Sequence, residues 1–112
     1  MKIAANPVEF RQILVNLMLN AIEAMPGGGT MTLGTERRGD QALITLSDSG
    51  AGMDASQLDH CFEPFFSTKE TGTGLDLSIC HGLVTRHGGT IDVLSEPGAG
   101  TSFLVRLPLS AD

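Results

Sequence analysis

The chain has 112 residues, of which 41% are hydrophobic, and a formal net charge of −6. This length suits one compact domain, and the hydrophobic content argues against a disordered chain. The acidic balance disfavours nucleic acid as a partner, because nucleic-acid binding depends on the neutralisation of phosphates by Lys and Arg.

The first predicted element is a long helix that follows a short apolar segment at residues 3–5. Asn6 is a favourable N-cap, Pro7 suits the first helical position, and Glu9 is placed to close a capping box. Apolar residues then recur at three- and four-residue steps, as they do on one face of a helix. A proline and three glycines at residues 26–29 end this helix.

The rest of the chain predicts a hairpin, a short helix, a second long helix and a second hairpin, in that order. Because helices and strand pairs are segregated, this order favours an α+β two-layer sandwich over a doubly wound parallel sheet. The strands are expected at residues 30–33, 42–46, 91–94 and 103–107, the short helix at 54–62 and the long helix at about 73–87.

The cysteines and histidines do not predict a metal site, and the hydropathy of the chain does not predict a membrane span. Cys61 and Cys80 lie in apolar surroundings typical of buried free thiols in a reducing compartment. His81 and His87 lack the spacing of a shared metal site with Cys80, so both are expected to be structural or exposed. No apolar run approaches a membrane span, and Met1 is not followed by a signal peptide. We expect a cytoplasmic domain without direct membrane contact, in a parent protein that can still be membrane-anchored.

Two asparagines and two glycine-rich segments are candidates for ligand binding. Asn16 and Asn20 share a face of the first helix, although such a pair is more often a solvated surface. Residues 48–52 (Asp-Ser-Gly-Ala-Gly) offer a carboxylate and a closely approaching backbone, although such a segment is usually only a turn. Residues 72–75 (Gly-Thr-Gly-Leu) open a helix, whose exposed N–H groups favour phosphate, but they match neither the P-loop nor the Rossmann pattern.

Five ordered segments together resemble the ATP-binding catalytic domain of bacterial sensor histidine kinases, in the histidine-kinase-like ATPase family. The resemblance runs from about Asn6 to Pro108, and the short segment between Lys69 and Gly72 is similar to the short ATP lid of nitrogen-regulation-type kinases. The five segments are residues 16–24 (Asn-Leu-Met-Leu-Asn-Ala-Ile-Glu-Ala), 48–52, 62–69 (Phe-Glu-Pro-Phe-Phe-Ser-Thr-Lys), 72–75 and 98–101 (Gly-Ala-Gly-Thr).

The resemblance implies a fold and a domain organisation. The implied fold is a two-layer α/β sandwich in which a mixed sheet packs on three helices. Residues 1–112 are expected to form one ATP-binding catalytic domain, truncated at its N-terminus, from which the usual first strand and the histidine-bearing domain are absent. The sheet edge left by the missing strand is a candidate surface for self-association, because unpaired edges can pair with another chain.

The resemblance also assigns residues to ATP and Mg²⁺. Asp48 would accept a hydrogen bond from the adenine amino group, and Thr101 would lie behind the base and bond to it through water. Gly50 and Gly52 would line the purine pocket, and Asn20 would ligate Mg²⁺. The residues implied at the phosphates are Asn16 near the terminal phosphate, the lid residue Lys69, and the loop residues Gly72, Thr73, Gly74 and Leu75.

The implied function is transfer of the ATP γ-phosphate to a histidine on a separate dimerisation domain, with Asn16, Asn20 and Lys69 as the catalytic residues. Related topoisomerase and mismatch-repair ATPases carry a water-polarising glutamate at the position of Asn16. Asn cannot act as a general base, which favours transfer to a protein over hydrolysis. The implied partners are the histidine-bearing dimerisation domain of the same kinase and, downstream, the receiver domain of a response regulator.

One departure from the family pattern leaves alternatives open. Asp76 stands where the family normally has the last glycine of its phosphate loop, and a carboxylate there repels phosphate. Asp76 also fits a helix capping box with Thr73, which would stabilise the site without nucleotide. The chain is alternatively a degenerate nucleotide-binding module that docks to a partner. An anti-sigma-factor-like serine kinase is a further alternative, which the identity of the phosphorylated residue distinguishes.

Overall fold

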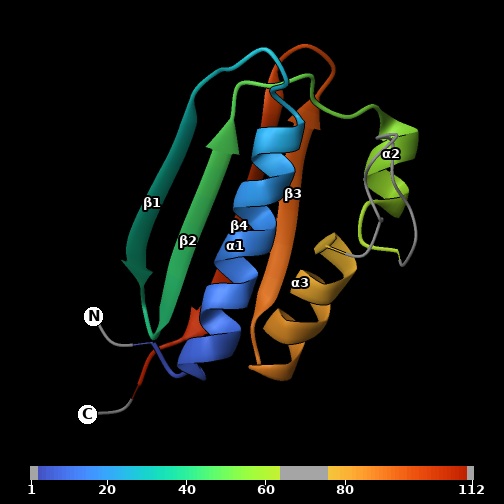
Figure 1. The fold of residues 1–112 in the computed structure, drawn as a ribbon. Helices are drawn as coiled ribbons and strands as arrows, with labels where there is room; N and C mark the ends of the chain where they lie inside the picture. The colour runs from blue at the N-terminus through green and yellow to red at the C-terminus, as the bar shows by residue number, and fades with distance from the viewer. Residues whose placement is uncertain (1–2, 64–75, 111–112) are drawn as a thin grey trace.

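The computed structural model describes residues 3–63 and 76–110, and its elements follow the predicted order (Figure 1). The α+β class and both hairpins are confirmed, with strands longer than the apolar alternation alone indicates. The elements are α1 (Pro7–Glu23), β1 (Met31–Arg38), β2 (Gln41–Asp48), α2 (Ala55–His60), α3 (Asp76–Arg86), β3 (Thr90–Glu96) and β4 (Gly100–Pro108).

The four strands among the described residues form one sheet in the order β1-β2-β4-β3. Every neighbouring pair is antiparallel, which corrects the expected mixed sheet for the described strands. For two of the pairs the reason is local. β1 and β2 are joined by only two residues, and β3 and β4 by only three. Connections this short permit only antiparallel pairing.

The helical layer consists of α1 and α3, which lie side by side over one face of the sheet (Figure 1). α2 lies to one side and has no buried residue, so two of the three helices in the described part of the chain cover the sheet. The core between the layers is built from aliphatic side chains with one cysteine and one phenylalanine. Its buried members are Ile13, Leu17, Ile44, Leu46, Cys80, Val84, Ile91, Phe103, Val105 and Leu107.

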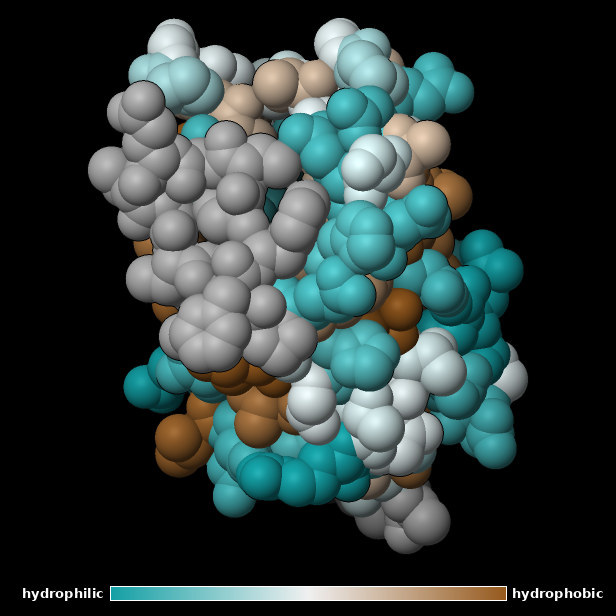
Figure 2. Space-filling view, turned by 90° about the vertical axis from the view of Figure 1, so that its right-hand side faces the viewer, coloured by the Kyte–Doolittle hydropathy of each residue, from teal (hydrophilic) through white to brown (hydrophobic). Residues whose placement is uncertain are grey.

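The other face of the sheet carries polar side chains. Asp92 on β3 and Arg106 on β4 form an exposed ion pair there, with 2.8 Å between the carboxylate and guanidinium atoms. Figure 2 shows a different side of the molecule, the side that carries α2 and α3, and much of the described surface there is also hydrophilic. The edge strand β1 is exposed along almost its whole length. The helices therefore cover one face of the sheet only, although Leu43 on the other face is also buried.

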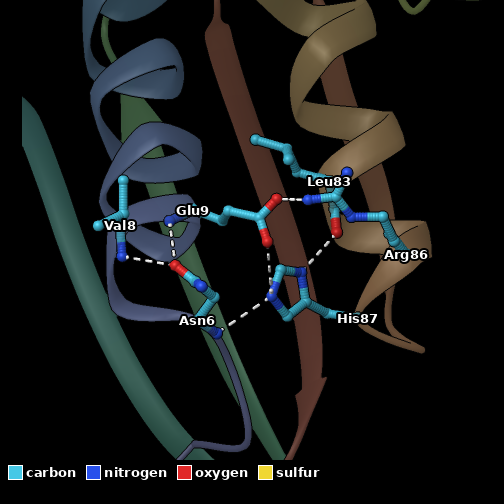
Figure 3. Close-up of polar contacts among 6 residues, drawn as sticks. All are labelled: Asn6, Val8, Glu9, Leu83, Arg86 and His87. Atoms are coloured by element: carbon cyan, nitrogen blue, oxygen red, sulfur yellow. Dashed lines mark hydrogen bonds and ion pairs between the residues drawn. The ribbon is translucent and has the colours of Figure 1, made fainter.

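The start of α1 is held by the end of α3 (Figure 3). Asn6 caps α1 as predicted, because its side chain accepts hydrogen bonds from the N–H groups of Val8 and Glu9. The predicted capping box is wrong, because Glu9 does not fold back onto Asn6. The N–H of Asn6 instead donates to Nε2 of His87 at 3.2 Å, and Glu9 pairs with Arg86. A contact between distant parts of the chain has replaced a local one.

His87 has the structural role expected of it. Its side chain is only 11% exposed, and Nε2 lies 3.8 Å from a carboxylate oxygen of Glu9. Because Nε2 accepts from Asn6, the proton of the neutral ring lies on Nδ1, which donates to the carbonyl of Leu83 at 2.7 Å. His81, by contrast, is exposed.

Both cysteines are buried free thiols, as predicted. Sγ of Cys80 donates to the carbonyl of Ile13 at 3.3 Å, which joins α3 to α1. Burial raises the pKa of the Cys61 thiol to about 11. Among the described residues, no helix is long and apolar enough to cross a membrane.

Candidate functional site

Three polar side chains are buried in the described part of the chain, and all three are predicted site residues: Asn16, Asp48 and Thr101. Asp48 and Thr101 are cross-strand partners at the end of β2 and the start of β4. They continue the inward-facing alternation of Leu46 and Phe103, so both side chains point to the helix side of the sheet. Directly opposed residues lie roughly 5 Å apart at Cβ. The sheet thus brings a carboxylate and a hydroxyl together at the end of the core.

The loop after β2 lies against the end of α1. Oδ1 of Asp48 accepts a hydrogen bond from the Gly50 N–H at 2.8 Å, which orients the carboxylate. The Ala51 N–H donates to the carbonyl of Ala24, the C-cap of α1, at 3.3 Å. A Cβ on Gly50 would overlap that same carbonyl, so only glycine permits this approach.

The turn between β3 and β4 closes on the same loop. Gly52 has a φ of 74°, and a Cβ there would overlap the carbonyl of Glu96. The Gly98 N–H donates to the carbonyl of Ala51 at 2.7 Å. Two of the five predicted segments, which are far apart in the sequence, are therefore joined by direct contacts.

Ser95 on β3 lies beside Thr101 and was not predicted as a site residue. Its Oγ lies 2.8 Å from Oγ1 of Thr101, 2.9 Å from the carbonyl oxygen of Gly100 and 2.8 Å from the backbone N of Met53. Ser95 and Thr101 are partners in the β3–β4 register. The only signal that finds Ser95 is this register, because a serine within a strand has no local signature.

The two asparagines lie on α1, which leads to this end of the sheet. Asn16 is 3% exposed and accepts a hydrogen bond from Nε2 of Gln12 at 2.6 Å, so a solvated surface is excluded for Asn16. Asn20 is partly buried and lies one turn before Ala24. At about 1.5 Å of rise per residue, Asn20 and Asn16 stand about 6 Å and 12 Å back along the axis from Ala24. The amides thus lead away from the carboxylate along one helix.

The phosphate loop and lid lie outside the described residues, and the assignments made there stay predictions. α3 begins at Asp76, directly after this segment. The predicted capping box between Thr73 and Asp76 also falls outside the described part. The five predicted site residues concerned are Lys69, Gly72, Thr73, Gly74 and Leu75.

Comparison with known proteins identifies what the chain is similar to. Residues 5–111 match the family described as histidine kinase-, DNA gyrase B-, and HSP90-like ATPases. The chain is 43% identical over 109 residues to the sensor histidine kinase ZraS of Escherichia coli (strain K12), a match that covers 97% of this chain and 23% of ZraS. It therefore spans about a quarter of the length of the curated relatives it matches.

Two solved structures are also similar. The nucleotide-free catalytic domain of the histidine kinase ThkA is 33% identical with a TM-score of 0.83, over 94% of this chain and 69% of that one. Full-length ShkA in complex with AMPPNP is 28% identical with a TM-score of 0.83, over 93% of this chain and 22% of that one.

Proposed function

This chain belongs to the histidine kinase-, DNA gyrase B-, and HSP90-like ATPase family, and we propose that it transfers the γ-phosphate of ATP to a histidine on a separate dimerisation domain. Its sequence and fold are those of the ATP-binding catalytic domain of sensor histidine kinases. The observation that carries the proposal is the burial of Asp48 and Thr101 beside a glycine-dependent loop. A buried carboxylate is unfavourable without partners, and the N–H of Gly50 occupies only one of its oxygens. Among residues 3–63 and 76–110 no hydrogen bond reaches the second oxygen, and we propose that a ligand occupies it.

In this proposal the base of ATP binds at Asp48. The carboxylate can only accept hydrogen bonds, so it suits the exocyclic amino group of adenine. Thr101 lies across the strand pair from Asp48 and bonds to the base through water. Gly50 and Gly52 line the pocket with backbone, because a Cβ at either position would collide with a neighbouring carbonyl.

The phosphates then run along α1 past the two asparagines. Asn20 is the proposed Mg²⁺ ligand, since an amide oxygen suits this hard cation, which commonly takes one or two protein ligands together with substrate phosphates. Asn16, about 6 Å further along the axis, lies near the terminal phosphate. Bound Mg²⁺ would supply charge neutralisation. The remaining proposed phosphate contacts are Lys69, Gly72, Thr73, Gly74 and Leu75, outside the described residues.

The chemistry required of this chain is positioning. Asn16 cannot remove a proton from water, which disfavours hydrolysis, and the nucleophile comes from the acceptor histidine of another domain. Asn16, Asn20 and Lys69 are proposed to hold the phosphates for in-line transfer, as positioning and charge stabilisation dominate phosphoryl transfer.

The proposed partners follow from the reaction. The acceptor is the histidine-bearing dimerisation domain of the same kinase, and the receiver domain of a response regulator takes the phosphate next. A cytoplasmic location is proposed because the reaction consumes ATP. Self-association is proposed through β1, an exposed edge strand of Met31–Arg38. Light scattering that reports only a monomer at high concentration would contradict this last point.

One residue favours a second candidate function. Asp76, the first residue of α3, replaces a glycine of the family pattern, and its negative charge opposes phosphate. The chain would then be a degenerate nucleotide site that works by docking to a partner. A serine kinase of the anti-sigma-factor type remains an alternative with the same site and a different acceptor.

Two measurements test these functions. Titration calorimetry with Mg²⁺–ATP compares the chain with Asp76→Gly: binding by both supports the kinase, binding by the glycine variant alone supports the degenerate module, and binding by neither contradicts both. Transfer of labelled phosphate to the histidine-bearing domain of the parent kinase then identifies the acceptor. An acid-labile product supports histidine, whereas an acid-stable product supports serine.

A further inference from the structure

Ser95 makes three hydrogen bonds that together use its full capacity. A serine hydroxyl has one proton to donate and two lone pairs to accept with. The partners of Oγ are the carbonyl oxygen of Gly100 at 2.9 Å, the N–H of Met53 at 2.8 Å and the hydroxyl of Thr101 at 2.8 Å.

The direction of each hydrogen bond follows from the chemistry of the partner. The Gly100 carbonyl can only accept, so Ser95 gives its proton to Gly100. The Met53 N–H can only donate, so it takes one lone pair of Oγ. The proton of the third contact must therefore come from Thr101, which donates to Ser95.

This direction fixes what Thr101 can offer a ligand. Its only proton is directed to Ser95, so Oγ1 retains lone pairs alone. Asp48, its cross-strand partner, is a carboxylate and also only accepts. Asp48 and Thr101 therefore present two acceptors from neighbouring strands, both at buried positions.

We propose that Ser95 is a specificity-determining residue, which holds Thr101 as an acceptor and so makes the site prefer a 6-aminopurine to a 6-oxopurine. The proposal rests on the nucleotide-binding function given above. A 6-amino group has two N–H donors, one for Asp48 and one for Thr101 or for a bridging water whose two protons are taken by Thr101 and Asp48. A 6-oxo group places an acceptor opposite both, and neither residue can turn a proton toward it.

Ser95 could in principle serve only to join β3 to the loop at Met53, and the two roles predict different results. If the role of Ser95 is purely structural, removing its hydroxyl lowers the affinity for every nucleotide by the same factor. If Ser95 instead holds Thr101 as an acceptor, removing the Ser95 hydroxyl changes the ratio of the affinities for 6-amino- and 6-oxopurine nucleotides, because the hydroxyl of Thr101 can then rotate its proton toward a 6-oxo group.

The test measures dissociation constants for Mg²⁺–ATP and Mg²⁺–ITP, which differ in the group at position 6. Calorimetry is run on the chain, Ser95→Ala, Ser95→Thr and Ser102→Ala, each also in an Asp76→Gly background. Ser102 is the matched control, because its hydroxyl bonds to Ser47 on the other face of the sheet. We expect Ser95→Ala to reduce the preference for ATP about tenfold, near one hydrogen bond of about 1.4 kcal/mol. Ser95→Thr and Ser102→Ala should retain it.

A double-mutant cycle covers the case in which Ser95→Ala loosens the loop. With Thr101→Val as the second change, Ser95→Ala should not alter the ATP-to-ITP ratio further, because the hydroxyl it releases is gone. If the ratio of the ATP and ITP dissociation constants in Ser95→Ala is within twofold of that of the parent, the proposed role of Ser95 is wrong, although the proposed nucleotide binding is not. Failure of the parent and of Asp76→Gly to bind either nucleotide overturns the proposed function itself, and this inference with it.

Discussion

Replacing Asp48 with asparagine tests the base pocket with almost no change of shape. Oδ1 of Asp48 accepts from the Gly50 N–H at 2.8 Å, and the other oxygen is proposed to accept from the adenine amino group. Asparagine has only one acceptor oxygen, and its NH₂ group only donates. Whichever way the amide is turned, its NH₂ group faces a donor, either the N–H of Gly50 or the amino group of the base.

The expected cost is one charge-assisted hydrogen bond. Hydrogen bonds to charged groups contribute about 1.5–3 kcal/mol, which corresponds to roughly a 10- to 150-fold increase in the dissociation constant for Mg²⁺–ATP. The position is 8% exposed, so water cannot readily replace the lost acceptor.

The assay is calorimetry on the chain, Asp48→Asn and Asp92→Asn. Asp92 is the matched control, because it lies exposed on the other face of the sheet with Arg106 as its partner. Thermal unfolding of each variant checks that the fold persists. An affinity of a folded Asp48→Asn within threefold of the parent would refute the role of this carboxylate in reading the base.

Further predictions concern the fold that supports the site. Gly52→Ala should lower the free energy of unfolding, measured in urea, by about 2 kcal/mol or more, because Gly52 has a φ of 74° and an added Cβ would overlap the Glu96 carbonyl. Gly34→Ala, at a position with open space around it, should not have this effect. Equal losses of stability in the two variants would contradict this prediction. His87→Ala should lower the free energy of unfolding by about 1–2 kcal/mol, and replacement of the exposed His81 by alanine should lower it by less. A larger loss for His81→Ala than for His87→Ala would exclude a structural role for His87. Because burial raises the pKa of the Cys61 thiol from 9.0 to about 11, its contribution to stability is complete below pH 9 and is lost between pH 9 and about 11. Urea unfolding of Cys61→Ala should lack that loss, and an identical pH dependence would contradict the assignment.

Local patterns in the sequence predicted α1 and the strands β2 and β4 because each of these elements buries one face against the core. The inward residues of β2 alternate with period two, and those of α1 recur at helical spacing. The cap at Asn6 is also local and was predicted correctly. The predicted capping box is wrong because the backbone N–H of Asn6 donates to His87 instead of Glu9. His87 is 81 residues away and reaches Asn6 only through tertiary packing.

The site was predictable where residue chemistry and family pattern coincide. Asp48 and Thr101 stand in motifs, although their burial together depends on the β2–β4 register. Ser95 carries no pattern of its own and becomes visible only when the strand pairing brings it to Thr101. For Asn16, the spacing gave the helix face but not its burial, which depends on the packing of α1 against the rest of the fold.

The contact between Glu9, Arg86 and His87 has a mechanical consequence. It pins the first turn of α1 to the last turn of α3, at the end of the helical layer far from Ala24. The 11 residues of α3 extend about 16 Å from the pinned end to its first turn. If α3 tilted by roughly 10° about the pinned end, its first turn would move by about 3 Å while the pinned end scarcely moved. Such a tilt would displace the backbone most at Asp76, next to the predicted phosphate loop.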